Sequence, residues 1–352
     1  MSWPLPPEVS DLIIDCLCNE PATLKACCLV SKSWVPRARK HLFACVPLED
    51  ADYIRLWMKA FPDPSNSPAH HTRDLRIFGE IPADNQWIRV FRRIEKLYVG
   101  DYTKASLVQL HGLSPTIKYL DIAHSCLPFA DIFDLVCSFP LLEDLTWRCR
   151  KSESDSDGWV APSTSPKFTG TLFLTREIRS VARGLLALPG GLHFTSVDLI
   201  CPVEQAESAM DLVSGCSETL ESLCIDYCQY DHRSPRMPPP LDLSHMAKLK
   251  HAEFHFRIPN VRWIVATLET AKTDTLQQIT LHSSIFFNNE VSEVIHREWQ
   301  DMDHLLARLW TSHSIVPELK STSRIRNLGF AAPVLLPKLV NMGVVCKVEK
   351  YE

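Results

Sequence analysis

Short segments in which apolar and polar residues alternate recur along most of the chain, and this recurrence restricts the fold more than any other feature. Alternation with a period of two is typical of a half-buried β-strand. The clearest segments are residues 73–79, 94–100, 117–124, 142–149, 194–201, 220–228, 249–256 and 276–283. They begin roughly 20 to 30 residues apart, except for one gap about twice as long, which residues 170–174 divide. We therefore expect one strand-containing unit to be repeated many times.

Helical patterns fill the intervals between these segments. Residues 128–145, 204–223 and 261–279 each read as a helix, a short polar turn and a strand. One strand and one helix per unit of this length is typical of an irregular leucine-rich-repeat-like solenoid, whose units bury their apolar faces by stacking on each other. A helix that begins near residue 299 and a strand at 344–350 are expected to cap its end.

The first 46 residues have a different pattern, which predicts three short helices. Proline is tolerated in the first turn of a helix and costs about 3 kcal/mol in its interior. Pro7, Pro21 and Pro36 therefore mark three helix starts, the last helix running to Phe43. The apolar residues of these helices cover more than one face, so the helices must pack on something besides each other. They either cap the domain that follows or dock a partner.

Residues 5–43, LPPEVSDLIIDCLCNEPATLKACCLVSKSWVPRARKHLF, resemble the F-box motif. This segment is similar to the F-box-like segments of large protein families of mushroom-forming fungi. The C-terminal parts of those proteins are divergent leucine-rich repeats. The resemblance implies a helical module that docks an Skp-type adaptor and, through it, a cullin-based ubiquitin ligase. The residues that stand in register with the motif are Leu5, Pro6, Glu8, Ile13, Leu17, Leu29, Val30 and Trp34.

The resemblance also implies which residues face the adaptor. Leu5 and Pro6 match the exposed Leu-Pro of the motif, and Trp34 matches an internal anchor. The full set expected at the adaptor is Leu5, Pro6, Val9, Ile13, Ile14, Leu17, Leu29, Val30 and Trp34. The chain departs from the motif in a cysteine cluster, Cys16, Cys18, Cys27 and Cys28, whose spacing does not suit a zinc site.

These patterns predict three regions and one leading function. The regions are an F-box-like helical module at 1–46, a linking helix and loop at 47–71, and the irregular solenoid at 72–352, with an acidic, serine-rich insertion at 150–167. The predicted function is substrate recognition in an Skp–cullin–F-box ubiquitin ligase, with the repeat surface holding a protein target and no catalysis by this chain. A non-ligase scaffold, in which the helices only cap the solenoid, is the alternative. An α/β enzyme is a third reading, but no phosphate loop or catalytic constellation supports it.

One strand segment carries a polar group that could bind a target. His251, Glu253 and His255 are two residues apart, which places them on one face of a strand. No further ligand lies near them in the sequence, so we expect neither a metal site nor a cofactor. Cys224 and Cys228, near the end of another strand, are expected to pack in the core.

Composition narrows the class of protein further. The formal net charge of −5 gives no basic field for nucleic acid or acidic membranes, and 11 glycines against 25 prolines disfavour a nucleotide-binding fold. The sequence contains neither a run of about 18 apolar residues nor a secretory signal pattern. The 13 cysteines, scattered through apolar segments, are expected to be free thiols. We therefore expect an intracellular protein, cytoplasmic and/or nuclear, without nucleic-acid or membrane partners.

Overall fold

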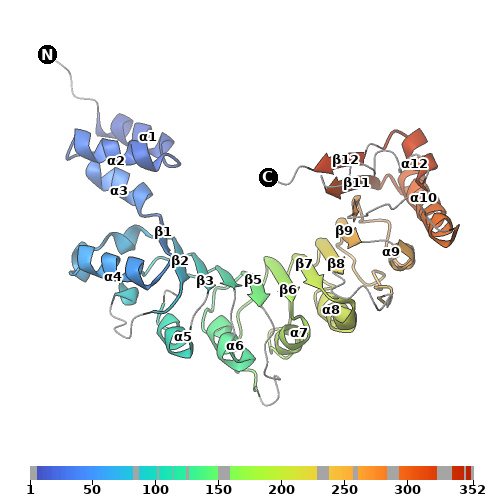
Figure 1. Cartoon of the computed structure of the whole chain (residues 1–352), viewed down its shortest axis with the longest axis horizontal. Helices are drawn as coiled ribbons and strands as arrows, with labels where there is room; N and C mark the ends of the chain where they lie inside the picture. Colours follow the sequence, from blue (N-terminus) through green and yellow to red (C-terminus); the bar gives the residue numbers. More distant parts are fainter. Residues whose placement is uncertain are drawn as a thin grey trace. The chain divides into compact units, whose positions relative to one another are not determined.

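The computed structural model describes the chain except for residues 1–5, 82–86, 101–102, 114, 124–126, 150–158, 228–237, 257–260, 284–292, 323–334, 345 and 350–352. The chain divides into two compact units, Met1–Lys167 and Phe168–Glu352 (Figure 1). Both units contain parallel strands that alternate with helices. The fold is therefore α/β in each unit.

The first unit begins with three helices, α1 (Pro7–Cys16), α2 (Pro21–Val30) and α3 (Val35–Leu42). Each has a proline in its first turn, as the sequence predicted. Ile14, Leu24, Cys27 and Ala38 form a small buried core, and the side chains of Leu17, Cys28, Trp34 and Leu42 pack against it. The prediction of three short helices is confirmed.

A charged network ties α1 to α3. The Asp15 carboxylate accepts hydrogen bonds from Arg37 Nε at 2.6 Å and from Arg37 Nη2. His41 Nε2 lies 2.7 Å from Asp15 Oδ1. The hydrogen bonds from Arg37, and then those from His41, hold the pKa of Asp15 well below its usual range. The helices are thus held together by a carboxylate that must stay ionised as well as by their small core.

The first unit continues as a parallel sheet. Its elements are β1 (Cys45–Leu48), α4 (Ala51–Ala60), β2 (Asp74–Phe78), β3 (Lys96–Gly100), α5 (Lys104–Leu110), β4 (Tyr119–Ala123), α6 (Phe129–Cys137) and β5 (Asp144–Cys149), with short 3₁₀ turns at Pro64–Asn66, Pro68–His71 and Ile88–Val90. Each strand pairs in parallel with the next one along the chain. The strand order from β1 to β5 is therefore the order of the sequence.

The second unit repeats this arrangement. Its elements are β6 (Thr171–Arg176), α7 (Arg179–Leu186), β7 (Ser196–Cys201), α8 (Ala206–Gly215), β8 (Ser222–Tyr227), β9 (His251–Phe256), α9 (Val261–Glu269), β10 (Gln278–Ser283), α10 (Glu293–His313), β11 (Val316–Thr322), α12 (Pro337–Asn341) and β12 (Cys346–Glu349), with a 3₁₀ turn at Val203–Gln205. The strands β6 to β12 are also parallel and in sequence order. A doubly wound enzyme would reverse its strand order, and neither unit does so.

One backbone motif recurs at the start of most strands. The carbonyl oxygen of Glu95 accepts the N–H groups of both Lys118 and Tyr119, at 2.8 and 3.0 Å. In the second unit, the carbonyl of Glu221 accepts the N–H groups of Lys250 and His251 at the same two distances. Each pair of hydrogen bonds to one carbonyl fixes where the next strand begins, and this sets the register of the sheet.

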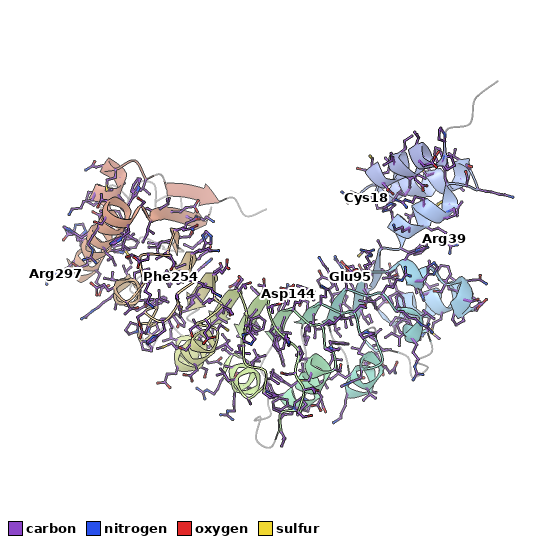
Figure 2. The ribbon with its side chains drawn as sticks, turned by 180° about the vertical axis from the view of Figure 1, so that it is seen from behind. Cys18, Arg39, Glu95, Asp144, Phe254 and Arg297 are labelled. Atoms are coloured by element: carbon purple, nitrogen blue, oxygen red, sulfur yellow. The ribbon has the colours of Figure 1, made fainter. Side chains whose placement is uncertain are left out.

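The strands have two unlike faces in each unit. Leu97 and Val99 of β3 are buried, whereas Lys96 and Tyr98 point the other way and remain partly exposed. In the first unit α5 and α6 lie on one side of the strands, and in the second unit α7, α8 and α9 do so (Figure 1). Side chains also stand on the opposite side, where no described helix of the same unit covers the strands (Figure 2). We call this side the uncovered face.

An aromatic cluster joins the end of α3 to α4 and to the segment before β3. The ring of Trp57 on α4 lies 6.0 Å from that of Phe43, 4.8 Å from that of Phe61 and 5.5 Å from that of Phe91. Trp57 and Phe91 are buried. Since Phe43 directly follows α3, the helices continue into the sheet through a shared apolar core.

The predicted fold class, a three-helix module followed by an irregular leucine-rich-repeat-like solenoid, is wrong. The structure is an α/β fold of parallel strands, and α1 to α3 belong to the same compact unit as β1 to β5. The physical reason is that α3 leads directly into β1. The carbonyl of Ala44 accepts the N–H groups of Arg73 and Asp74 at the start of β2, and Phe43 packs on Trp57.

Individual strands were predicted better than the fold class. The eight alternating segments, the segment at 170–174 and the final strand all correspond to observed strands. The sequence patterns missed β1 and β11, and they missed the helices α5, α7 and α12. Of the described helices, none combines the length and the apolar character needed to cross a membrane.

Replacing Asp15 with asparagine is expected to destabilise the α1–α3 bundle at neutral pH, and the destabilisation is expected to become smaller as the pH falls below about 4. Because the pKa of the folded carboxyl is lowered, its stabilising effect is present above about pH 4 and is lost as the pH falls through the folded value. The measurement is the thermal midpoint of both proteins between pH 7 and pH 3. Asp52→Asn, at an exposed pair with Arg55, is the matched control. A difference between wild type and Asp15→Asn that is constant with pH would contradict the prediction.

Replacing Trp57 with alanine is expected to lower the free energy of unfolding of the first unit by about 3–5 kcal/mol, because it removes the ring shared by α4, Phe43 and Phe91. Urea unfolding followed by circular dichroism measures the change. Val108→Ala on α5, where the side chain is exposed, should change it by less than about 0.5 kcal/mol. Equal effects of the two substitutions would show that the cluster does not stabilise the unit.

Candidate protein-docking surfaces

The first helix exposes one apolar stripe. Val9, Leu12 and Ile13 follow one another at helical spacing, and all three side chains are exposed, Leu12 by 64%. Ile14, by contrast, is fully buried in the core of the helices. Ile14 therefore belongs to the core and is unavailable to a partner. Leu12 lies on the apolar face that the sequence indicated, although it was not among the residues expected at the adaptor.

The second helix exposes two large apolar residues at its end. Leu29 is 89% exposed and Val30 is 69% exposed. Complete burial of such a side chain is worth roughly 1.5–3 kcal/mol, so leaving both in water forgoes a large stabilisation. An exposed apolar residue is unremarkable by itself, but five of them on two short helices suggest a binding site. We call Val9, Leu12, Ile13, Leu29 and Val30 the exposed apolar set.

The other residues expected at the adaptor divide into three groups. Pro6 is exposed and immediately precedes α1. Leu17 and Trp34 are partly buried and pack against the core of the helices. Leu5 lies outside the residues that the structure describes. Pro6 therefore remains available to a partner beside the exposed apolar set, whereas Leu17 and Trp34 stabilise the helices that present it.

The uncovered face of the first unit is rich in tyrosine and arginine. The Arg76 guanidinium lies 4.8 Å from the centre of the Tyr98 ring, and the rings of Tyr98 and Tyr119 are 5.2 Å apart. Arg148 Nη2 forms an ion pair of 3.0 Å with Asp121 Oδ2. These residues come from four consecutive strands, because register pairing brings Arg76, Tyr98 and Asp121 side by side.

Asp121 is buried within this group. Burial raises the pKa of its carboxyl, and the Arg148 charge opposes that shift. Tyr119 Oη lies 3.2 Å from Thr146 Oγ1, which fixes the ring beside the carboxylate. Asp121 Oδ1 is buried and has no hydrogen-bond partner among the described residues. The face thus combines stacked rings, guanidinium groups and one unsatisfied acceptor, which are features of protein-binding surfaces.

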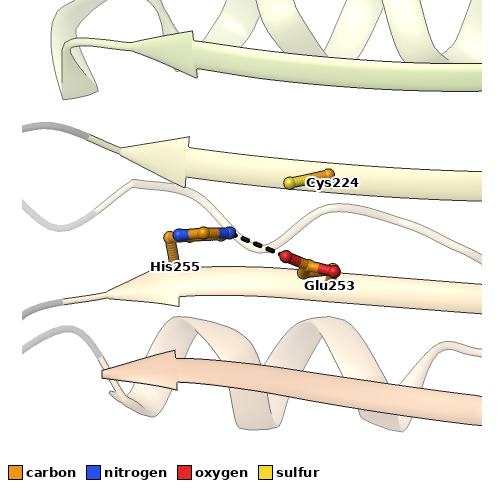
Figure 3. A group of neighbouring side chains, drawn as sticks. All are labelled: Cys224, Glu253 and His255. Carbon is orange, nitrogen blue, oxygen red and sulfur yellow. Dashed lines mark hydrogen bonds and ion pairs between the residues drawn. The ribbon is translucent and has the colours of Figure 1, made fainter. Parts of the chain in front are cut away.

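In the second unit, the uncovered face brings together two of the three residues predicted on 249–256. Glu253 and His255 of β9 are half-buried, and His255 Nε2 donates to Glu253 Oε1 at 2.9 Å (Figure 3). His282 of β10 is buried, and its Nε2 lies 3.0 Å from the same oxygen. His251 shares the strand face but is exposed and stands outside this contact. Sequence reasoning missed His282 because it lies on another strand.

Cys224 of β8 belongs to the same group. It is the register partner of Glu253 and stands on the uncovered face (Figure 3), so the prediction that Cys224 packs in the core is wrong. The prediction for Cys228 falls outside the described residues. Burial, followed by the charges of Asp198 and Glu253, raises the pKa of the Cys224 thiol well above its usual range. A neutral thiol is a poor nucleophile, so this geometry does not favour covalent catalysis at Cys224.

The sulfur, oxygen and nitrogen atoms of this group are close enough to share a cation. One donor atom each from Cys224, Glu253 and His255 lies within 4.8 Å of the others. Among the described residues, no other group of three histidine, cysteine, aspartate or glutamate side chains meets this geometry. The uncovered face of the second unit therefore has one candidate metal site.

Comparison with known proteins adds no family assignment. No protein-family model and no curated protein sequence matches this chain.

Proposed function

We propose that this chain is the target-recognition subunit of an Skp–cullin–F-box type ubiquitin ligase. In this proposal α1 and α2 dock the Skp-type adaptor, which connects the chain to a cullin. A protein target binds the uncovered sheet face and is held near the ubiquitin-charged enzyme. The chain contributes proximity and performs no covalent step itself.

The exposed apolar set carries the proposal. Leu29 and Val30 stand in register with the F-box motif, and both side chains are largely exposed. The core of a protein interface is apolar, and a few well-buried side chains supply most of its binding energy. Pro6, exposed just before α1, is the remaining described residue of the motif's exposed Leu-Pro. Their exposure and their motif positions together support docking at this surface.

The uncovered face of the first unit supports the proposal that a protein target binds the sheet. Tyrosine and arginine are enriched among residues that dominate protein–protein binding energies. Tyr98, Tyr119 and Arg76 stack along neighbouring strands. A rigid parallel sheet holds them in place before binding, which lowers the entropy cost of association. The face therefore suits a protein target better than a small-molecule substrate, which would require a deep pocket.

The proposal also implies a compartment. Skp-type adaptors and cullins act inside the cell, so the chain is proposed to be cytoplasmic and/or nuclear. Nine cysteines of the described residues are free thiols, which suits a reducing compartment.

Leu29→Asp and Val30→Asp, made together, are expected to weaken binding to a purified Skp-type adaptor by at least about 30-fold, since each places a charge where an apolar contact is buried. Biolayer interferometry with the full-length protein measures the dissociation constant. Val108→Asp is the matched control, because Val108 is a comparably exposed apolar residue (66%) on α5.

The control should bind the adaptor like the wild type, and circular dichroism should be unchanged in all three proteins. The adaptor proposal fails if the wild type does not bind, or if the double variant binds with wild-type affinity. A loss of binding by Val108→Asp equal to that of the double variant would also contradict docking through α2.

A further inference from the structure

Four polar side chains lie close together on the uncovered face of the second unit. Parallel register pairs Cys224 with Glu253, and it pairs His255 with His282. Glu253 and His255 are two residues apart on β9, so both project from the same side of the strand. Neighbouring strands lie about 4.8 Å apart, which places the four side chains at the corners of one compact group.

The two imidazole rings are stacked face to face beside the Glu253 carboxylate. Their planes are parallel to within 1° and their centres are 4.2 Å apart. His255 Nε2 lies 2.9 Å and His282 Nε2 lies 3.0 Å from Glu253 Oε1. One ion cannot lie in two parallel ring planes, so the two Nε2 atoms do not share a metal. His282, which contacts Glu253, is a neighbour of the donor group and not a member of it.

We propose that Cys224, Glu253 and His255 form a binding site for a divalent transition-metal ion, with zinc as the preferred metal. Thiolate and imidazole donors select zinc over magnesium and calcium, which take only oxygen ligands. Three protein donors leave the fourth position of a tetrahedral shell to a solvent molecule. The ion joins β8 to β9.

The dimensions fit with a small adjustment. Zinc bonds of about 2.0 Å to nitrogen and 2.3 Å to sulfur place donor atoms roughly 3.5 Å apart. The donors of Cys224, Glu253 and His255 are within 4.8 Å of one another without a metal. Rotation of the Cys224 and Glu253 side chains closes this difference, because both are half-buried and neither lies within a packed core.

The surrounding charges favour a cation. Asp198 on β7 is the register partner of Cys224 and accepts a hydrogen bond from its thiol. The charges of Asp198, Glu253 and Asp226 all oppose ionisation of that thiol. On metal binding the S–H bond breaks and the S–Zn bond forms, and the proton passes to the solvent. Glu253 simultaneously exchanges its contacts with the two imidazoles for one with the metal.

The test uses reduced, chelator-treated full-length protein titrated with Co²⁺, which takes the same ligands as zinc and absorbs visible light. A tetrahedral site with a thiolate gives intense visible bands and a sulfur-to-cobalt charge-transfer band, and zinc should remove both at one equivalent. Cys224→Ser should abolish the charge-transfer band. Glu253→Gln and His255→Gln should each weaken cobalt binding by more than about 100-fold.

His251→Gln is the matched control, because His251 lies on the same strand face outside the group. It should bind cobalt like the wild type. Cys16→Ser/Cys18→Ser, in the N-terminal helices, should do the same and excludes adventitious binding there. The proposal is overturned if the wild type shows no such bands, or if Cys224→Ser keeps them. Should Cys224→Ser fail to fold by circular dichroism, wild-type binding by Glu253→Gln and His255→Gln overturns it instead.

Discussion

The structure depends on the way in which each strand fixes the start of the next. A single carbonyl, such as that of Glu95 or Glu221, accepts two successive N–H groups from the following strand. These two hydrogen bonds are compatible with only one register. A slip of one residue would turn every side chain of the strand to the other face. The row of Leu97 and Leu120 under the helices and the row of Tyr98 and Asp121 on the uncovered face both follow from this register.

The two faces that result have different roles. The buried side chains pack under the helices of their own unit, so they stabilise the fold. On the opposite side, residues far apart in sequence meet because their strands are neighbours. The Tyr98–Tyr119 pair and the His255–His282 pair are both produced in this way. Both of the proposed functions of the sheet, target binding and metal binding, rely on this second face.

Sequence patterns predicted local structure well because alternation and proline placement are local signals. They identified most strands, and they located α1, α2 and α3 from Pro7, Pro21 and Pro36. They missed β1 and β11, since both strands contain a proline and neither shows clear alternation. The fold class was wrong because the contact of Phe43 with Trp57, which joins the helices to the sheet, cannot be read from the sequence of either residue.

The candidate sites could be predicted only in part, because sequence patterns do not give the contacts between separate elements. Placing Glu253 and His255 on one face required only the period of a strand, whereas Cys224 and His282 come to lie beside them through pairing between strands. Similarly, periodicity marked Val9, Leu12 and Ile14 as apolar positions of α1. Only the packing of α1 on α3 decides that Ile14 is buried and that the other two are exposed.

The central claim is that α1 and α2 dock an adaptor through side chains that the fold leaves in water. Amide hydrogen exchange of the full-length protein, with and without a purified Skp-type adaptor, tests it most directly. The account predicts slower exchange along α1 and at the end of α2, around Leu29 and Val30, and no change along α5. Unchanged exchange in α1 and α2, with adaptor present at saturating concentration, would contradict it.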